Sequence, residues 1–299
     1  MARRSHSRPT AWISAVVVVA LAVVVGVLVI IAIDRARPAL TNESLAPIPT
    51  FSPAEPQSSP SPSPAPTLTP IARADERFLT ASSEGVIWRG IAGSCADGAD
   101  PLIERSTDGG GTWNDVTPLY RGVAQITRLD AFAGTQAQAV ALLDGDCSID
   151  GLRTFTQGRF WESYDEVLAT SSFIQGDDPA RVVSPDRVIG APCDSARGLR
   201  GAGTTLALVC DGEAFRLAGD SWQQLDVDGA VAVTVNDSSF IVAHLTPDCA
   251  GLALTRVSDA SNFVVACVEG LDPDAPTTIE VSGESVLVWS GSSFTELPL

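Results

Sequence analysis

Residues 106–113 read Ser-Thr-Asp-Gly-Gly-Gly-Thr-Trp, and this octamer constrains the fold more than any other stretch of the chain. Glycine accepts positive φ angles, and an aspartate carboxylate can accept local backbone N–H groups, so the segment predicts a tight turn. The indole of Trp113 can then cover apolar surface between strands. The octamer therefore predicts a β-hairpin whose second strand opens with an aromatic side chain.

A shorter pattern recurs along the same region: a glycine, two further residues, and then an aromatic residue that opens a strand. The four copies are Gly110 to Trp113, Gly158 to Trp161, Gly219 to Trp222 and Gly291 to Phe294, and residues 258–263 resemble a worn copy. Short apolar runs separated by Gly, Asp and Ser predict strands near 85–91, 137–143, 204–209, 239–245 and 285–289. Residues 73–299 are therefore expected to form an all-β domain.

The octamer matches the Asp-box pattern Ser-x-Asp-x-Gly-x-Thr-Trp at every defined position, so the domain resembles the sialidase-like (BNR/Asp-box repeat) β-propeller superfamily, as a non-catalytic member. The resemblance implies a structural turn, away from the ligand-binding face, made by Ser106, Asp108, Gly110, Thr112 and Trp113. Propeller repeats run to about 40–50 residues. We therefore expect about five blades, within a range of four to six, and a two-layer β-sandwich is the structural alternative.

The resemblance does not imply an activity, because Asp-boxes occur in enzymes and in other proteins. Sialidases use an arginine cluster, a Tyr–Glu nucleophile pair and an acidic proton donor, and they tend to carry an Arg-Ile-Pro motif, which this chain lacks. Tyr164 lies near Glu162 and Glu166, but on a predicted outer strand, far from the axis of a propeller. We name no catalytic residue. A generic glycosidase needs only two carboxylates, so hydrolysis stays open.

Residue usage excludes several other classes of site. Every basic side chain is arginine, which excludes Schiff-base chemistry and a P-loop. His244 is the one histidine of the globular part, within an apolar run, and is expected to be structural. Acid clusters at 144–151, 226–228 and 272–274 permit calcium, but solvated turns are the favoured interpretation. We therefore expect neither a cofactor nor a metal.

Charge and cysteine content bear on the environment of the domain. Beyond residue 70 the chain carries 14 arginines against 33 acidic residues, so nucleic acid is not an expected partner. All six cysteines lie in the globular part, which indicates disulfides and an oxidising compartment. Two pairs bracket expected strand hairpins, and the third pair is what remains. The expected disulfides are Cys193–Cys210, Cys249–Cys267 and Cys95–Cys147.

The N-terminal part predicts a membrane anchor and a stalk. Residues 12–33 are 22 residues without a charge, enough to cross a bilayer, and no convincing cleavage site follows them. Residues 34–72 form a stalk rich in proline and serine, which favours extended chain. We expect residues 1–11 to be a cytoplasmic tail and residues 73–299 to lie outside the cell, at a bacterial-type cell surface.

Together these features predict a single-pass membrane protein whose propeller binds or scaffolds a protein or glycan ligand at the cell surface. The alternatives are a cell-surface glycoside hydrolase, such as an exo-sialidase-like enzyme, and an assembly factor for a membrane complex. The ligand, any catalysis and the oligomeric state stay open.

Overall fold

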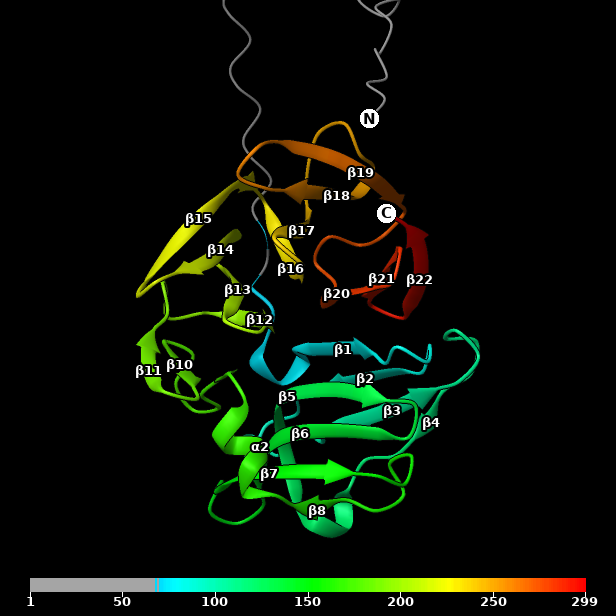
Figure 1. Ribbon diagram of the computed structural model, residues 1–299, viewed down its shortest axis with the longest axis vertical. Coiled ribbons are helices and arrows are strands. Elements are labelled where there is room, and N and C mark those ends of the chain that lie inside the picture. The colour runs from blue at the N-terminus through cyan, green and yellow to red at the C-terminus, as the bar shows by residue number, and fades with distance from the viewer. Residues whose placement is uncertain (1–67, 69) are drawn as a thin grey trace, which may run out of the picture. The chain divides into compact units, whose positions relative to one another are not determined.

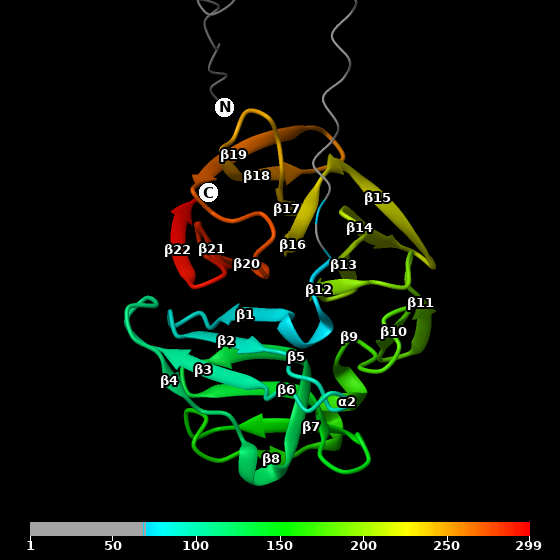
Figure 2. The ribbon, with the colours of Figure 1, turned by 180° about the vertical axis from the view of Figure 1, so that it is seen from behind.

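Six antiparallel sheets follow one another along the chain in the computed structural model, which describes Leu68 and residues 70–299. The first strands of the six sheets lie side by side in chain order, and the last of them lies beside the first. Figures 1 and 2 show the resulting ring of blades from its two sides. The domain is a six-bladed β-propeller, so the preferred count of five blades is wrong, although six lies within the expected range.

Blades 1 and 2 each have four strands. In blade 1 these are β1 (Arg77–Ala81), β2 (Ile87–Ile91), β3 (Leu102–Ser106) and β4 (Asn114–Asp115), with the short helix η1 (Arg73–Asp75) before them. In blade 2 they are β5 (Val123–Ala133), β6 (Gln136–Leu143), β7 (Ile149–Thr154) and β8 (Glu162–Ser163), with η2 (Leu119–Arg121) before and α2 (Asp165–Thr170) after them.

Blade 3 is the smallest and has only three strands. They are β9 (Phe173–Ile174), β10 (Arg181–Ser184) and β11 (Arg187–Gly190). Blade 4 consists of β12 (Arg197–Ala202), β13 (Thr205–Cys210), β14 (Glu213–Ala218) and β15 (Ser221–Asp228). The short strands of blade 3 carry no glycine–aromatic turn, which is why the repeat pattern passes over this blade.

Blade 5 has four strands and blade 6 has three. Blade 5 consists of β16 (Ala230–Asn236), β17 (Ser239–His244), β18 (Gly251–Val257) and β19 (Asn262–Glu269). Blade 6 consists of β20 (Thr277–Ser282), β21 (Ser285–Ser290) and β22 (Ser293–Pro298). In all six blades the chain runs outward from the ring of first strands, and the cores lie between neighbouring sheets.

The predicted turn joins β3 to β4 and is held by side-chain hydrogen bonds. The Ser106 hydroxyl accepts the Gly110 N–H at 2.9 Å, and Asp108 Oδ1 accepts the Thr112 N–H at 2.9 Å. The Thr112 hydroxyl donates to Asp108 Oδ2 at 2.7 Å. These bonds lower the pKa of Asp108 to about 2, and the backbone bond from Thr112 contributes most.

Blade 2 repeats this turn between β7 and β8 with hydroxyl groups alone. The Thr154 hydroxyl accepts the Gly158 N–H at 3.1 Å, and the Thr156 hydroxyl accepts the Phe160 N–H at 2.9 Å. The central glycine has φ 84° here and φ 88° in blade 1. The Trp161 indole then fills the core, where its N–H donates to Val116 O at 3.1 Å. A threonine thus takes the place of the aspartate without changing the turn.

The ring closes between blades 1 and 6 through side chains, because each of these blades keeps its own strands. Arg77 donates to Gly291 O at 2.6 Å and lies over the Trp289 ring at 4.0 Å. Arg89 lies between two indoles, 3.8 Å from the centre of the Trp113 ring and 4.7 Å from that of Trp289. We call these five residues the closing seam.

Three disulfides reinforce the domain. They join Cys95 to Cys147, Cys193 to Cys210, and Cys249 to Cys267, the pairs expected from the sequence. The first links the loop after β2 to the loop after β6, and so ties blade 1 to blade 2. No helix within the described residues is long and apolar enough to cross a membrane. The expected tail, the 12–33 span and most of the stalk lie outside the described residues.

Candidate binding pocket on the propeller axis

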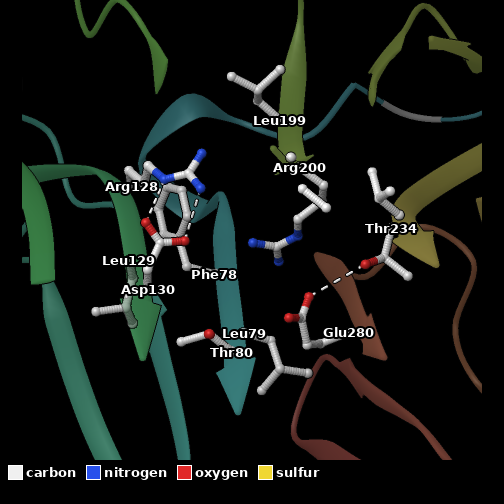
Figure 3. A pocket seen from close by; sticks show the side chains of 13 residues that line it. Phe78, Leu79, Thr80, Arg128, Leu129, Asp130, Leu199, Arg200, Thr234 and Glu280 are labelled. Atoms are coloured by element: carbon white, nitrogen blue, oxygen red, sulfur yellow. Dashed lines mark hydrogen bonds and ion pairs between the residues drawn. The ribbon is translucent and has the colours of Figure 1, made fainter. Parts of the chain in front are cut away.

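A cavity of about 120 Å³ lies among the inner strands of five blades. Its polar lining comes mainly from β5, β12, β16 and β20, and β1 contributes Phe78, Leu79 and Thr80. Figure 3 shows these side chains around the cavity, which we call the axial pocket. Pockets that enclose drug-sized ligands are about 300–1,000 Å³. The axial pocket therefore suits a small group, such as one acidic side chain or a small anion.

One wall of the axial pocket is an ion pair on β5. Arg128 and Asp130 are two residues apart and share one face of the strand, while Leu129 points to the opposite face and is buried in the core. Arg128 Nε lies 2.5 Å from Asp130 Oδ2, and Arg128 Nη2 lies 2.9 Å from Asp130 Oδ1. Arg128 also donates to Ser172 O at 2.6 Å. Hydrogen bonds and an ion pair therefore hold the side chains of this wall in place.

The opposite wall holds an arginine and a glutamate that have no ionic partner of their own. Arg200 on β12 donates to the Thr278 hydroxyl, and Glu280 on β20 accepts from the Thr234 hydroxyl at 3.3 Å. In the described part of the chain neither side chain forms an ion pair. Both keep part of their surface open, and Figure 3 shows their charged ends directed into the axial pocket.

Burial perturbs both groups. It raises the pKa of Glu280 to about 7, the positive charge of Arg200 opposes this rise, and the charge of Asp130 adds to it. Burial also lowers the pKa of Arg200, against the attraction of Glu280. A carboxyl group with a pKa near neutrality, facing a cavity and a cation, is typical of a functional site.

A second, narrower cavity of about 20 Å³ shares Arg200 and lies at the start of the inner strands. Arg77 and Arg197 line it; Arg197 donates to Val231 O at 2.8 Å, and burial lowers the pKa of Arg77 to about 10. Glu76 on its rim accepts the Gly198 N–H at 2.8 Å. Arginines therefore gather along the axis of a domain in which acidic residues outnumber arginines 33 to 14.

The residues that the sequence singled out lie elsewhere. The turn of Ser106, Asp108, Gly110, Thr112 and Trp113 belongs to the outer hairpin of blade 1, and none of these residues lines the axial pocket.

The other residues considered for chemistry also lie away from the axial pocket. Tyr164 precedes α2 instead of continuing an outer strand, and its ring packs edge-on against Phe155. The Nε2 atom of His244 forms a hydrogen bond of 2.8 Å with the Thr255 hydroxyl, and burial lowers the pKa of His244. Within residues 68 and 70–299, no group of three or more His, Cys, Asp or Glu side chains is arranged to hold a metal ion.

The four charged residues of the axial pocket are not among those that the sequence singled out. They are Arg128, Asp130, Arg200 and Glu280. A signal is present in the sequence, because each charge interrupts an apolar β-run, with Leu129, Leu199 and Ile279 as buried neighbours. Such interruptions do not reveal which strands are innermost, and only the ring brings them together.

No protein-family model matches the sequence, and no curated protein matches it. Among solved structures, "YCF48 bound to D1 peptide" is 12% identical, with a TM-score of 0.41, covering 74% of this chain and 78% of that one. A GH74 xyloglucanase from Xanthomonas campestris is 12% identical, with a TM-score of 0.38, over 75% and 44%. A GH43_1 enzyme from Xanthomonas citri is 10% identical, with a TM-score of 0.38, over 78% and 90%. Likenesses this distant carry no argument about function.

Proposed function

We propose that the chain is a membrane-anchored, extracytoplasmic binding module whose axial pocket takes an acidic group from a protein partner at the cell surface. The observation that carries the proposal is the gathering of arginines on the axis of an otherwise acidic propeller. The disulfides support an oxidising compartment, and the uncharged 12–33 segment supports the anchor.

The charge distribution favours a specific anionic contact over general attraction. The acidic surface repels anions at long range, so an anionic group gains only if it reaches the axis, where four arginines and three acids line the two cavities. A small pocket also favours one acidic side chain over a whole macromolecular anion. Propellers also present loops around one end of a rigid ring, and such loops can make further contacts with a partner.

Site-specific cross-linking tests this proposal in cells that make the full chain. A photo-reactive amino acid in place of Ala202, which lines the axial pocket, should give a discrete cross-linked product, and Arg200→Gln should remove it. The matched control is Arg216→Gln, which removes an arginine paired with Asp259 outside the axial pocket. The same product from the probe-bearing chains with and without Arg200→Gln, or no product when Arg200 is intact, would contradict the proposal.

The identity of the cross-linked partner separates two forms of the proposal. A subunit of a membrane complex would support the assembly-factor form, and a free surface protein would support the scaffold form. Cross-linking to glycan alone would contradict a protein partner.

The expected topology has a test of its own. Protease added to intact cells should remove a tag placed after Leu299 and leave a tag placed before Met1 intact. Protection of both tags would contradict an external domain.

A second candidate is a glycoside hydrolase, favoured by one observation: Glu280 and Asp130 both line the axial pocket, and the pKa of Glu280 is raised to about 7. A raised carboxyl of this kind can act as a general acid, with the second carboxylate as its partner. Release of methylumbelliferone from a panel of methylumbelliferyl glycosides tests it. Turnover that Glu280→Gln abolishes would establish this activity. The binding proposal expects no turnover.

A further inference from the structure

We infer that the axial pocket is a proton-linked carboxylate site: a carboxylate enters between Arg200 and Glu280, and Glu280 takes up one proton as the carboxylate binds. The inference rests on the proposed function and names the regulation of the same site. Its ligand class is a monocarboxylate, either the side chain of an acidic residue or a small free carboxylate.

Arg200 is within salt-bridge distance of no carboxylate in the described chain, although the charge of Glu280 attracts it. A charge inside a protein is costly unless it is paired, and Arg200 has only the neutral Thr278 hydroxyl as its hydrogen-bond partner in the described chain. The side chain borders both axial cavities, so a ligand can approach it. Guanidinium groups match carboxylates in shape and charge. Arg200 is thus placed to bind one.

Arg128 is not free to compete with Arg200 for a ligand carboxylate. Both oxygens of Asp130 and the carbonyl of Ser172 already accept from its guanidinium. A ligand carboxylate that met Arg128 would have to displace Asp130, whereas at Arg200 it would displace only a hydroxyl contact. The site is therefore centred on the wall formed by Arg200 and Glu280.

An added negative charge in the axial pocket favours the protonated form of Glu280. The charged groups near Glu280 are Arg200 from β12 and the paired Arg128 and Asp130 from β5. The pocket-lining residues of β1 and β16 are not titratable, and on the adjacent strand Glu280 pairs with Leu287. The pKa of Glu280 is already about 7, so a second carboxylate nearby raises it further. The proton comes from solvent, and the resulting carboxyl O–H can donate to an oxygen of the bound carboxylate.

The sign of the pH dependence follows from this linkage. Below about pH 6 Glu280 already carries the proton, so affinity changes little until the ligand itself is protonated. Above about pH 7 each binding event must take up one proton, so affinity falls by up to about tenfold per pH unit. Glu280→Gln mimics the protonated carboxyl. It should keep the affinity found at low pH up to at least about pH 8.5.

Calorimetric titration of the purified full chain in lipid nanodiscs tests the inference. The probes are acetate and a capped Gly-Gly-Asp-Gly-Gly pentapeptide, with the asparagine analogue as the negative peptide. Titrations at pH 6, 7 and 8, in cationic buffers of different ionisation enthalpy, give affinity and proton uptake together. We expect uptake of close to one proton at pH 8, and none for Glu280→Gln. Glu296→Gln on β22 is the matched control and should behave as wild type.

Each outcome decides a separate point. Binding that Arg200→Gln abolishes, but that takes up no proton, would overturn the proton linkage and leave the proposed function standing. No binding of either probe to a folded chain would overturn the carboxylate site, while the cross-linking experiment decides the proposed function independently. Tighter binding of the aspartate peptide than of acetate identifies an acidic side chain as the source. The reverse order identifies a free carboxylate.

Discussion

Asp108 and Glu280 each accept a hydrogen bond from a threonine hydroxyl, yet their surroundings move their pKa values in opposite directions. Asp108 lies in an exposed turn, where several donors favour its charged form and hold its pKa near 2. Glu280 lies inside the ring, where loss of water favours its neutral form and raises its pKa to about 7. In the turn, hydrogen-bond donors affect the pKa more than burial does, whereas on the axis burial affects the pKa more than the donor does.

Asp108→Asn should weaken the domain at neutral pH, because an amide cannot accept from both Thr112 groups and from the Ser106 hydroxyl as a carboxylate does. We expect the melting temperature to fall by about 2–4 °C. The carboxylate stabilises the fold above its unfolded pKa of about 4 and ceases to do so as the pH falls toward 2. Melting curves from pH 7 to pH 2 should therefore converge with those of the variant. The control is Asp186→Asn, in the exposed turn between β10 and β11, and a constant difference at all pH values would contradict the prediction.

Glu280→Gln should stabilise the domain above pH 7. A carboxyl group whose pKa is raised in the folded state does not destabilise the fold below its pKa in the unfolded state, about 4.5. Above about pH 7 it destabilises the fold by its full amount. At about 1.4 kcal/mol per pKa unit, the gain on substitution is at most about 3–4 kcal/mol at pH 8. Urea unfolding at pH 5 and pH 8 measures it. A gain of the same size at both pH values would show that the effect is not titration.

At the scale of elements, the two outer hairpins show which parts of a turn are replaceable. Asp108 and Thr156 occupy the same position in blades 1 and 2, and each accepts the N–H four residues on. The glycine two residues further on, Gly110 or Gly158, is present in both turns, because its φ is positive and a side chain of another strand or loop lies close to it. A Cβ at Gly158 would lie 2.5 Å from Val116 Cβ.

Gly158→Ala should therefore lower the free energy of unfolding by more than the strain of a positive φ angle alone. Gly219, in the corresponding hairpin of blade 4, has φ 64° but no heavy atom within 4 Å of the position that an alanine Cβ would occupy, so Gly219→Ala isolates the backbone strain. We expect Gly219→Ala to cost about 1–2 kcal/mol. Gly158→Ala should cost about 1–3 kcal/mol more, because of overpacking. Urea unfolding compares them, and equal losses would contradict the crowding argument.

The elements that the sequence predicts best are the second strands of the blades. The five expected runs correspond to β2, β6, β13, β17 and β21, each packed between two other strands of its sheet and largely buried, so that it reads as a continuous apolar run. Blade 3 escapes prediction because its strands hold two to four residues and leave too little pattern. The final copy of the repeat, at Gly291, joins β21 to β22, and its aromatic residue opens β22, the outermost of the three strands of blade 6. The axial pocket escapes prediction because it depends on which strands face the axis.

At the scale of the whole molecule, the disulfides differ in how much of the ring they constrain. Cys95–Cys147 spans 52 residues and joins two blades, whereas Cys249–Cys267 spans 18 residues within blade 5. A longer loop gives the unfolded chain more freedom to lose when it is cross-linked. The interblade disulfide should therefore stabilise the domain more.

Replacing both cysteines of each pair by serine tests this difference. The Cys95→Ser/Cys147→Ser variant should lose about 1 kcal/mol more stability than Cys249→Ser/Cys267→Ser, from the logarithm of the loop lengths. Urea unfolding of the two double variants measures it. A larger loss from the blade 5 pair would show that local packing, not chain entropy, sets the contribution of these disulfides.

The closing seam leaves the two ends of the domain joined by side-chain contacts and not by a shared sheet. Because blades 1 and 6 meet through Arg77, Arg89 and their aromatic neighbours, no sheet is shared between the two ends of the domain. The gap between the ends is then the same kind of boundary as that between any two consecutive blades, apart from a peptide connection. A gene duplication or deletion can therefore add or remove one whole blade without cutting a sheet. A circular permutation can likewise start the chain at another blade boundary with all six sheets intact.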